Sequence, residues 1–114
     1  MKNKLYQKIK PYIKYLGEYA GFNVYYVDGN YIRKNINEEF TNFGQHYSFA
    51  CIPENELWIE KEARDDERPF FIDHLLVEYR LMAKGVPYDK ALVEADKAEH
   101  RERRRADTSY PCWW

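Results

Sequence analysis

The sequence predicts an α+β fold: a small antiparallel sheet with an N-terminal helix and a C-terminal αα-hairpin packed on it. Three patterns favour this class. Apolar residues recur at helical spacing near the N-terminus, short segments rich in β-formers follow, and two helical segments joined at Gly85 close the chain. The 114 residues, 45% of them hydrophobic, suit one domain over residues 1–108, with an aromatic tail over 109–114.

We expect the first helix over residues 3–20, where Pro11 either kinks it or begins a second helix and Gly21 ends it. The apolar residues that recur at helical spacing are Leu5, Ile9, Ile13 and Leu16.

Short strands are expected next. Residues 22–27 are rich in β-formers, and the turn signal Asp28-Gly29-Asn30 predicts that the chain returns as a strand over residues 31–33. Two further strands are expected over residues 47–52 and 56–60, with a turn between them that contains a proline.

The last two elements should form a helical hairpin. A charged connector leads into an apolar helix that runs from Phe70 to about Lys84 and ends at Gly85. Pro87 opens the next helix, whose inner side carries small alanines that allow the two helices to approach closely.

Charge is unevenly distributed. Residues 1–35 hold seven bases and two acids, whereas residues 36–80 hold four bases and eleven acids. The acidic middle could attract a cation or a basic partner, and the basic N-terminus could contact phosphate or an acidic partner, while solvated helix faces would account for the same charges. A protein partner or self-association therefore stays open, and a net charge of −1 gives no strong nucleic-acid signal. Cys51 and Cys112 form no CxxC pair, which favours a reduced, cytoplasmic protein, and no apolar run is long enough for a membrane span.

His74 and Glu78 are the most informative pair, because they lie one helical turn apart in the most apolar stretch, residues 70–82. Residues i and i+4 share a face, so the imidazole and the carboxylate point the same way. An uncompensated buried charge costs several kcal/mol, so the pair needs partners. A metal ion or a structural hydrogen-bond network would supply them, and both interpretations stay open.

Two further residues would complete a metal site. Glu99 continues the inner stripe of the last helix and would meet the preceding helix, which begins at Phe70, near His74. His46, in its polar loop, could supply a second imidazole. The four candidate ligands are a nitrogen and oxygen set suited to a divalent metal, zinc first: His46, His74, Glu78 and Glu99. The structural alternatives are a buried His–Glu pair, a solvated charge for Glu99 and a backbone cap for His46.

The catalytic residues stay unassigned. In zinc proteases with an HExxH helix the base is the glutamate after the first histidine, and Leu75 stands at that position here. Asp73 and Glu56 are the remaining candidates for an unusual base. Any enzymatic activity would therefore be that of a metal-dependent hydrolase.

The hairpin also carries a longer pattern. Its residues are His74, Glu78, Leu81-Met82, Gly85, Tyr88, Ala91, Ala95 and Glu99, preceded by an Ile-Pro…Trp-Ile segment over 52–59 and a turn over 27–33. This pattern resembles small uncharacterised prokaryotic and phage proteins of a metallopeptidase-like group. The resemblance implies a related fold and metal pocket. It does not imply proteolysis, because Leu75 and Leu92 stand where that group carries an acid and a histidine.

These patterns favour two functions, and a hydrolase with an unusual base such as Asp73 or Glu56 is a third possibility. The first is a metallopeptidase-like domain whose buried His/Glu cluster holds a structural or regulatory metal without protease activity. The second is a metal-free interaction or assembly module in which His74 and Glu78 are a structural pair. Eleven tyrosines and the Trp113-Trp114 tail favour the second, since aromatic side chains are enriched at interfaces.

Overall fold

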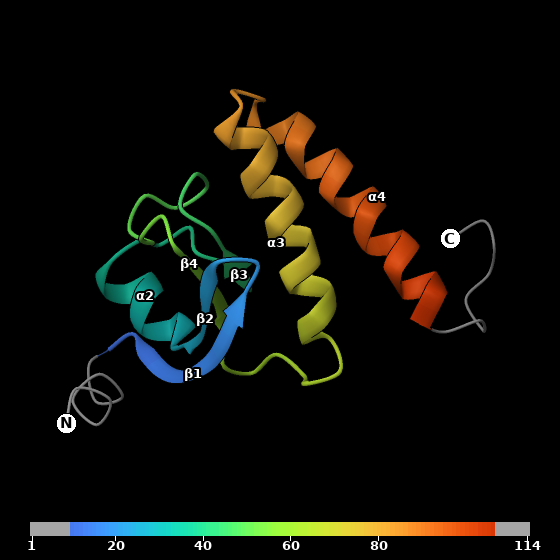
Figure 1. The fold of residues 1–114 in the computed structure, drawn as a ribbon. Coiled ribbons are helices and arrows are strands. Elements are labelled where there is room, and N and C mark those ends of the chain that lie inside the picture. Colours follow the sequence, from blue (N-terminus) through green and yellow to red (C-terminus); the bar gives the residue numbers. More distant parts are fainter. Residues whose placement is uncertain (1–9, 107–114) are drawn as a thin grey trace. The chain divides into compact units, whose positions relative to one another are not determined.

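The computed structural model describes residues 10–106, which divide into two compact units that meet in sequence between Asp65 and Asp66 (Figure 1). The first unit carries a sheet and a short helix, and the second carries two helices. The predicted α+β class is therefore confirmed. One domain over residues 1–108 stays a prediction, and the tail at 109–114 lies outside the described residues.

The first unit is built on a four-stranded sheet in the order β1-β2-β4-β3. β1 (Tyr12–Tyr19) pairs antiparallel with β2 (Phe22–Val27), and the two-residue β3 (Phe43–Gly44) pairs antiparallel with β4 (Glu56–Glu60). β2 and β4, however, are parallel. The sheet is therefore mixed and not purely antiparallel, because the chain between β2 and β4 crosses back before it rejoins the sheet.

β1 occupies much of the region where the sequence predicts a helix, and that part of the prediction is wrong. Its register shifts twice, between Tyr12 and Lys14 and between Tyr15 and Gly17. Each irregularity adds a residue to the strand, so Ile13 and Leu16 are both half-buried although they are three residues apart. Bulges thus imitate the spacing of a helix. Residues 3–9 of the expected helix lie outside the described part of the chain.

The turn signal after β2 begins a helix instead of a hairpin. Asp28 is the N-cap of α2 (Gly29–Asn35), where its Oδ1 accepts a hydrogen bond from the backbone N–H of Tyr31 at 3.1 Å. The strand predicted over residues 31–33 is therefore wrong. The strand predicted over 47–52 is also wrong, since these residues form turns that place Ile52 in the core.

The core of this unit lies on β2 and β4, together with α2 and the turns that follow it. All five residues of β4 are buried, which confirms the strand predicted over residues 56–60. One cluster of buried core side chains consists of Tyr25, Val27, Ile32, Phe40, Ile52 and Trp58.

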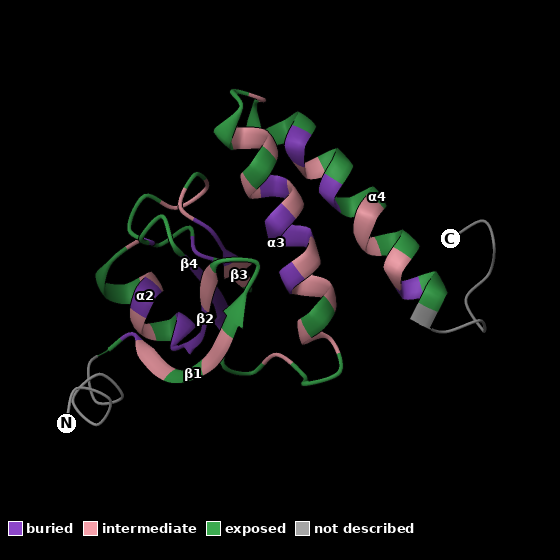
Figure 2. Cartoon of the chain, in the orientation of Figure 1, coloured by how far each residue is buried: buried purple, intermediate pink, exposed green. Residues whose placement is uncertain are grey.

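The second unit is the predicted helical hairpin, formed by α3 (Arg68–Ala83) and α4 (Tyr88–Ala106). Gly85 ends α3 with a positive φ of 95°, and its N–H donates to the carbonyl of Met82. Ala91 and Ala95 are fully buried, and Figure 2 shows buried positions recurring along one side of α4. The packing of this hairpin on the sheet stays a prediction. No helix within residues 10–106 has the length and apolar character of a membrane span.

Candidate functional site

The imidazole of His74 lies between two carboxylates. Its Nε2 is 3.2 Å from Oε2 of Glu78, one turn later on α3, and its Nδ1 is 3.0 Å from Oε1 of Glu99 on α4. The side chains of His74 and Glu78 are each only 4% exposed, and that of Glu99 is 17% exposed. Glu99 therefore reaches His74, as an antiparallel hairpin predicts.

The sequence of α4 explains why Glu99 arrives there. Residues four positions apart share a helix face, and Ala91, Ala95, Glu99 and Arg103 follow that spacing. The two alanines have no bulk to separate the helices. The stripe then ends at Glu99 and Arg103, which contact His74 on α3 and Glu67 just before α3.

The two carboxylate contacts of His74 favour a proton on both of its ring nitrogens. A carboxylate only accepts hydrogen bonds, so a histidine placed between Glu78 and Glu99 must donate from Nδ1 and from Nε2. Burial alone lowers the pKa of His74, but the hydrogen bonds to Glu78 and Glu99 outweigh this effect and raise it to about 9. His74 is therefore an imidazolium at neutral pH.

Glu99 is shared between His74 and Arg103. The guanidinium of Arg103 donates from Nε to Oε2 of Glu99 at 3.0 Å, and its Nη1 and Nη2 each donate to Glu67 at 2.8 Å. Arg103 also lies over the ring of Phe70, with Cζ 4.4 Å from the ring centre. Charges thus alternate along five side chains, which we call the charge network: Glu78, His74, Glu99, Arg103 and Glu67.

The pKa values within the charge network follow from these bonds. Burial would raise the pKa of Glu99, but its hydrogen bonds with His74 and Arg103 outweigh burial and lower it. The paired hydrogen bonds to Glu67 are the main reason that the pKa of Arg103 is raised. Glu99 and Arg103 are therefore held in their charged forms.

Among the described residues 10–106, one group of side chains is arranged so that it could hold a metal ion. Ligand atoms of His74, Asp96 and Glu99 all lie within 4.8 Å of one another, and Oδ1 of Asp96 is 3.4 Å from Nδ1 of His74. Ligands of a tetrahedral zinc ion lie about 3.4 Å apart, given metal–ligand bonds of about 2.1 Å. The two distances from Nδ1 are close to this value and the oxygens of Asp96 and Glu99 lie within 4.8 Å of each other, so the three atoms could surround a divalent cation once the Nδ1 proton has left.

Glu78 does not lie beside the ring nitrogen that faces Asp96 and Glu99, although the sequence predicts it as a ligand together with His74 and Glu99. It contacts Nε2, the ring nitrogen on the other side from Asp96 and Glu99. A metal-bound histidine commonly donates its second N–H to a carboxylate, which fixes the ring. Glu78 can therefore orient His74, and its role as a metal ligand stays a prediction.

Asp96 is the residue that sequence reasoning missed. Its side chain is 54% exposed, so no pattern of buried polar residues reveals it. It does lie three positions before Glu99, and residues three apart on a helix are neighbours. The pair Asp96 and Glu99 was the available signal.

His46 lies in the first unit, where its Nδ1 is 2.8 Å from the carbonyl oxygen of Ile52 and its ring contacts Tyr47. It is not one of the three residues grouped around Nδ1 of His74, and its role as a ligand stays a prediction. Its backbone contact matches the structural alternative.

Neither Asp73 nor Glu56, the candidates for a hydrolytic base, belongs to the group of possible metal ligands. Glu56 accepts hydrogen bonds from the Tyr12 hydroxyl at 2.6 Å and from Nε1 of Trp58 at 2.9 Å. Burial, with a smaller effect of Glu102, raises the pKa of Asp73. Leu75 is fully buried and has no acid–base group.

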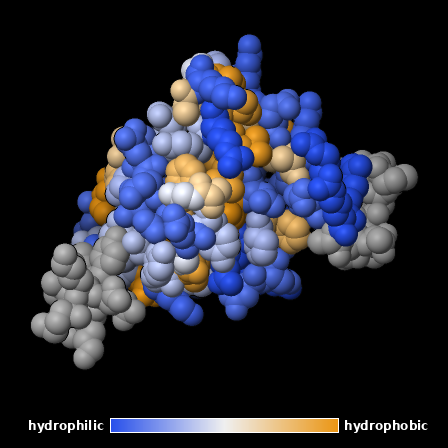
Figure 3. Space-filling model, in the orientation of Figure 1, coloured by the Kyte–Doolittle hydropathy of each residue, from blue (hydrophilic) through white to orange (hydrophobic). Residues whose placement is uncertain are grey.

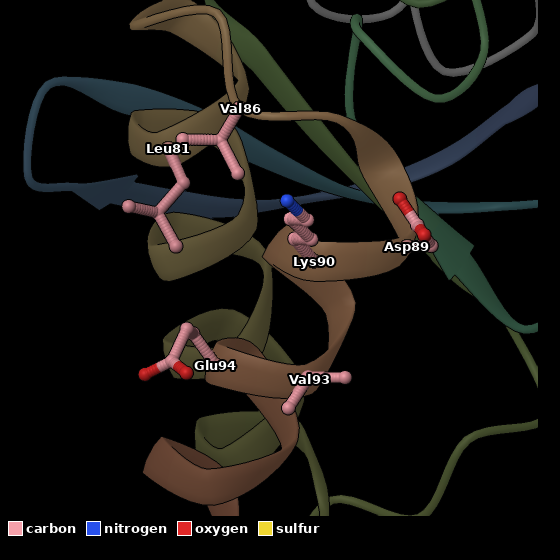
Figure 4. Close-up of a pocket in the computed structure, with 6 residues that line it drawn as sticks. All are labelled: Leu81, Val86, Asp89, Lys90, Val93 and Glu94. Carbon is pink, nitrogen blue, oxygen red and sulfur yellow. The ribbon is translucent and has the colours of Figure 1, made fainter.

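A separate hollow of about 520 Å³ lies near the turn of the hairpin (Figure 4). No residue of the charge network lines it, so it is distinct from the His74 group. Its lining combines apolar and charged side chains, namely Leu81, Val86, Asp89, Lys90, Val93 and Glu94.

No family model, curated protein or solved structure matches this chain.

Proposed function

We propose that the hairpin of α3 and α4 is a divalent-metal site of structural or regulatory type, of the metallopeptidase-like kind but without protease activity. The observation that carries the proposal is the grouping of ligand atoms from His74, Asp96 and Glu99 within 4.8 Å. One imidazole and two carboxylates suit zinc first and manganese second. His74 comes from α3 and the two acids from α4, so a bound ion would cross-link the hairpin.

The surrounding residues support this assignment. Glu78 holds the N–H at Nε2 and so directs Nδ1 toward the two acids. Arg103 holds the second oxygen of Glu99, which leaves Oε1 facing His74. The exposed carboxylate of Asp96 offers an ion a path from solvent.

The absence of protease activity rests on Leu75. Metal-assisted hydrolysis needs a base beside the metal-bound water, and the position after His74 carries a buried leucine. A metal held here would therefore stabilise the hairpin or report on metal availability.

The charge network favours a second candidate, a metal-free interaction module. His74 already has a carboxylate on each ring nitrogen, and the alternating charges of the network satisfy one another without an ion. In this reading His74 and Glu78 are a structural pair that fixes the hairpin, and the surface of the module binds a protein partner.

Asp96 distinguishes the two candidates, because it belongs to the metal group but not to the charge network. We would measure zinc content in protein purified without a histidine tag, and thermal unfolding with zinc or with chelator. For the metal site, zinc at 100 times its Kd should stabilise the protein by about 2.7 kcal/mol. Asp96→Asn should abolish this gain.

The matched control is Asp89→Asn, an exposed acid on the same helix outside the metal group. It should keep the response to zinc. Protein that contains no stoichiometric metal and melts identically in zinc and in chelator would overturn the metal site and leave the metal-free module.

A further inference from the structure

The solvent-facing side of α4 is basic along its length. Lys90, Lys97, Arg101 and Arg104 are all exposed. At 100° per residue they fall within an arc of about 60°, and at 1.5 Å per residue they span about 21 Å. Figure 3 shows strongly hydrophilic side chains over the C-terminal part of α4. We call these four residues the basic stripe.

The acids of α4 lie mostly away from the basic stripe. Glu99 and Glu102 are half-buried, on the side of the helix that carries Ala95, and Asp89 and Asp96 fall on one flank. Only Glu94 borders the stripe, where Nζ of Lys97 lies 3.4 Å from its Oε2. An exposed pair of this kind contributes little and is screened by salt, so the stripe keeps a positive potential.

The fold separates the buried Arg103 from the exposed bases of the basic stripe. Within the basic run from Arg101 to Arg105 it is the buried member, neutralised by Glu67 and Glu99. Arg101 and Arg104 instead face solvent. The chain has a net charge of −1, yet the helix collects four bases on one outward line.

We propose that the basic stripe binds the phosphate backbone of a nucleic acid, without reading its sequence. A line of cations on a straight helix fits a line of phosphates, and each guanidinium can donate two parallel hydrogen bonds to a phosphate. The stripe lies on the opposite face of α4 from Glu99, so this function is independent of the proposed metal site.

Two other polyanionic partners fit less well. A helix that lies on a lipid surface needs an exposed apolar face, but Ala91 and Ala95 on α4 are buried. An acidic protein would need aromatic or aliphatic anchors for its binding energy, and within the described part of α4 only Val93 lies beside the stripe. A phosphate backbone requires charge alone.

Salt dependence of binding tests the proposal. The full chain would be titrated against a labelled oligothymidylate by fluorescence anisotropy at several salt concentrations. Four phosphate contacts predict a slope of log K against log salt of about −2.8 for a single strand. Lys97→Gln with Arg101→Gln removes two contacts, so the slope should become about −1.4.

The matched control is Arg80→Gln with Lys84→Gln, which removes an exposed arginine and lysine at the same spacing from α3. It should leave the slope unchanged. Lys97→Arg with Arg101→Lys keeps both charges and should bind as the wild type does, which separates charge from any effect on folding.

Three results would overturn the proposal: no binding at low salt, an equal loss in both double glutamine variants, or tighter binding to polyglutamate or phosphatidylserine vesicles than to the oligonucleotide. The last would assign the stripe to an acidic protein or to a membrane surface.

Discussion

Arg103 and Glu67, which are 36 residues apart in sequence, form a bidentate ion pair in which Nη1 and Nη2 each donate a hydrogen bond of 2.8 Å to the carboxylate. The pair ties the last turns of α4 to the residue that precedes α3. It also holds Glu99 in the charge network, because the same guanidinium donates to that carboxylate.

Loss of Arg103 should therefore destabilise the hairpin strongly. Arg103→Ala leaves Glu67 without its cation and leaves Glu99 paired with His74 alone. Breaking a fully buried pair costs about 3–5 kcal/mol, and the cost here should lie below that because the Glu67 side chain is 32% exposed. Urea unfolding followed by circular dichroism would measure this cost. Arg104→Ala, an exposed neighbour, should change stability by less than about 0.5 kcal/mol. Equal effects of the two substitutions would contradict the prediction that the ion pairs of Arg103 stabilise the hairpin.

The titration of His74 should make stability depend on pH on the alkaline side. The pKa of His74 is about 9 in the folded state against 6.5 for the free side chain, so the folded state binds the proton more tightly. This stabilisation is complete below about pH 6.5 and is lost as pH rises through about 9. The upper limit of this stabilisation is roughly 3 kcal/mol.

Urea unfolding at about pH 6 and about pH 10 tests this dependence. His74→Gln cannot titrate, so its stability should vary less over the same interval. A wild-type curve that parallels the His74→Gln curve would show that His74 does not hold an extra proton.

Asp28 should contribute stability that is lost in acid. Its hydrogen bond from Lys10, at 2.8 Å, is the largest cause that lowers the pKa of Asp28 to about 2. The charged form is therefore favoured by folding, and the contribution present at neutral pH declines as pH falls from about 4 toward 2. Thermal melting over this range would follow the decline.

Substitutions at Asp28 separate its two roles. Asp28→Ala removes both the N-cap of α2 and the ion pair, and loss of a cap costs about 0.5–2 kcal/mol. Asp28→Asn keeps an oxygen that can cap Tyr31 N–H, so it should cost less. If the asparagine variant is as unstable as the alanine variant, the N-cap hydrogen bond makes no measurable contribution to stability.

Gly44 should tolerate no side chain. A Cβ at this position would lie 2.5 Å from Cδ2 of Phe49, a distance that real Cβ atoms do not adopt. Gly44→Ala must displace Phe49 or Ile52, and such overpacking costs about 1–3 kcal/mol. Gly21→Asn is the comparison: nothing lies within 4 Å of that Cβ, so its cost should be limited to the backbone strain of a positive φ, which asparagine tolerates better than most residues. A Gly44→Ala variant as stable as wild type would argue against this close packing.

The hairpin could be predicted from sequence because its signals are local. Gly85 ends α3 where it was expected to, and the alanine spacing of α4 is visible without knowledge of α3. The approach of Glu99 to His74 follows from those two facts.

The sheet could not be predicted so well because its determinants are not local. The parallel pairing of β2 with β4 depends on the path of the chain over residues 36–55, which has no regular pattern. The strand β1 was mistaken for a helix because its bulges change the spacing of buried side chains. Asp96 was missed because an exposed acid looks like any other solvated charge.

The bulges of β1 have a consequence for solubility. β1 is an edge strand of the sheet, and a long regular edge would offer its backbone N–H and C=O groups to strands of other molecules. Two breaks in register, one at Gly17 with a φ of 126°, interrupt that row of donors and acceptors. The opposite edge, β3, has only two residues. The sheet is thus poorly suited to recruit further strands, which protects the protein against aggregation through its edges.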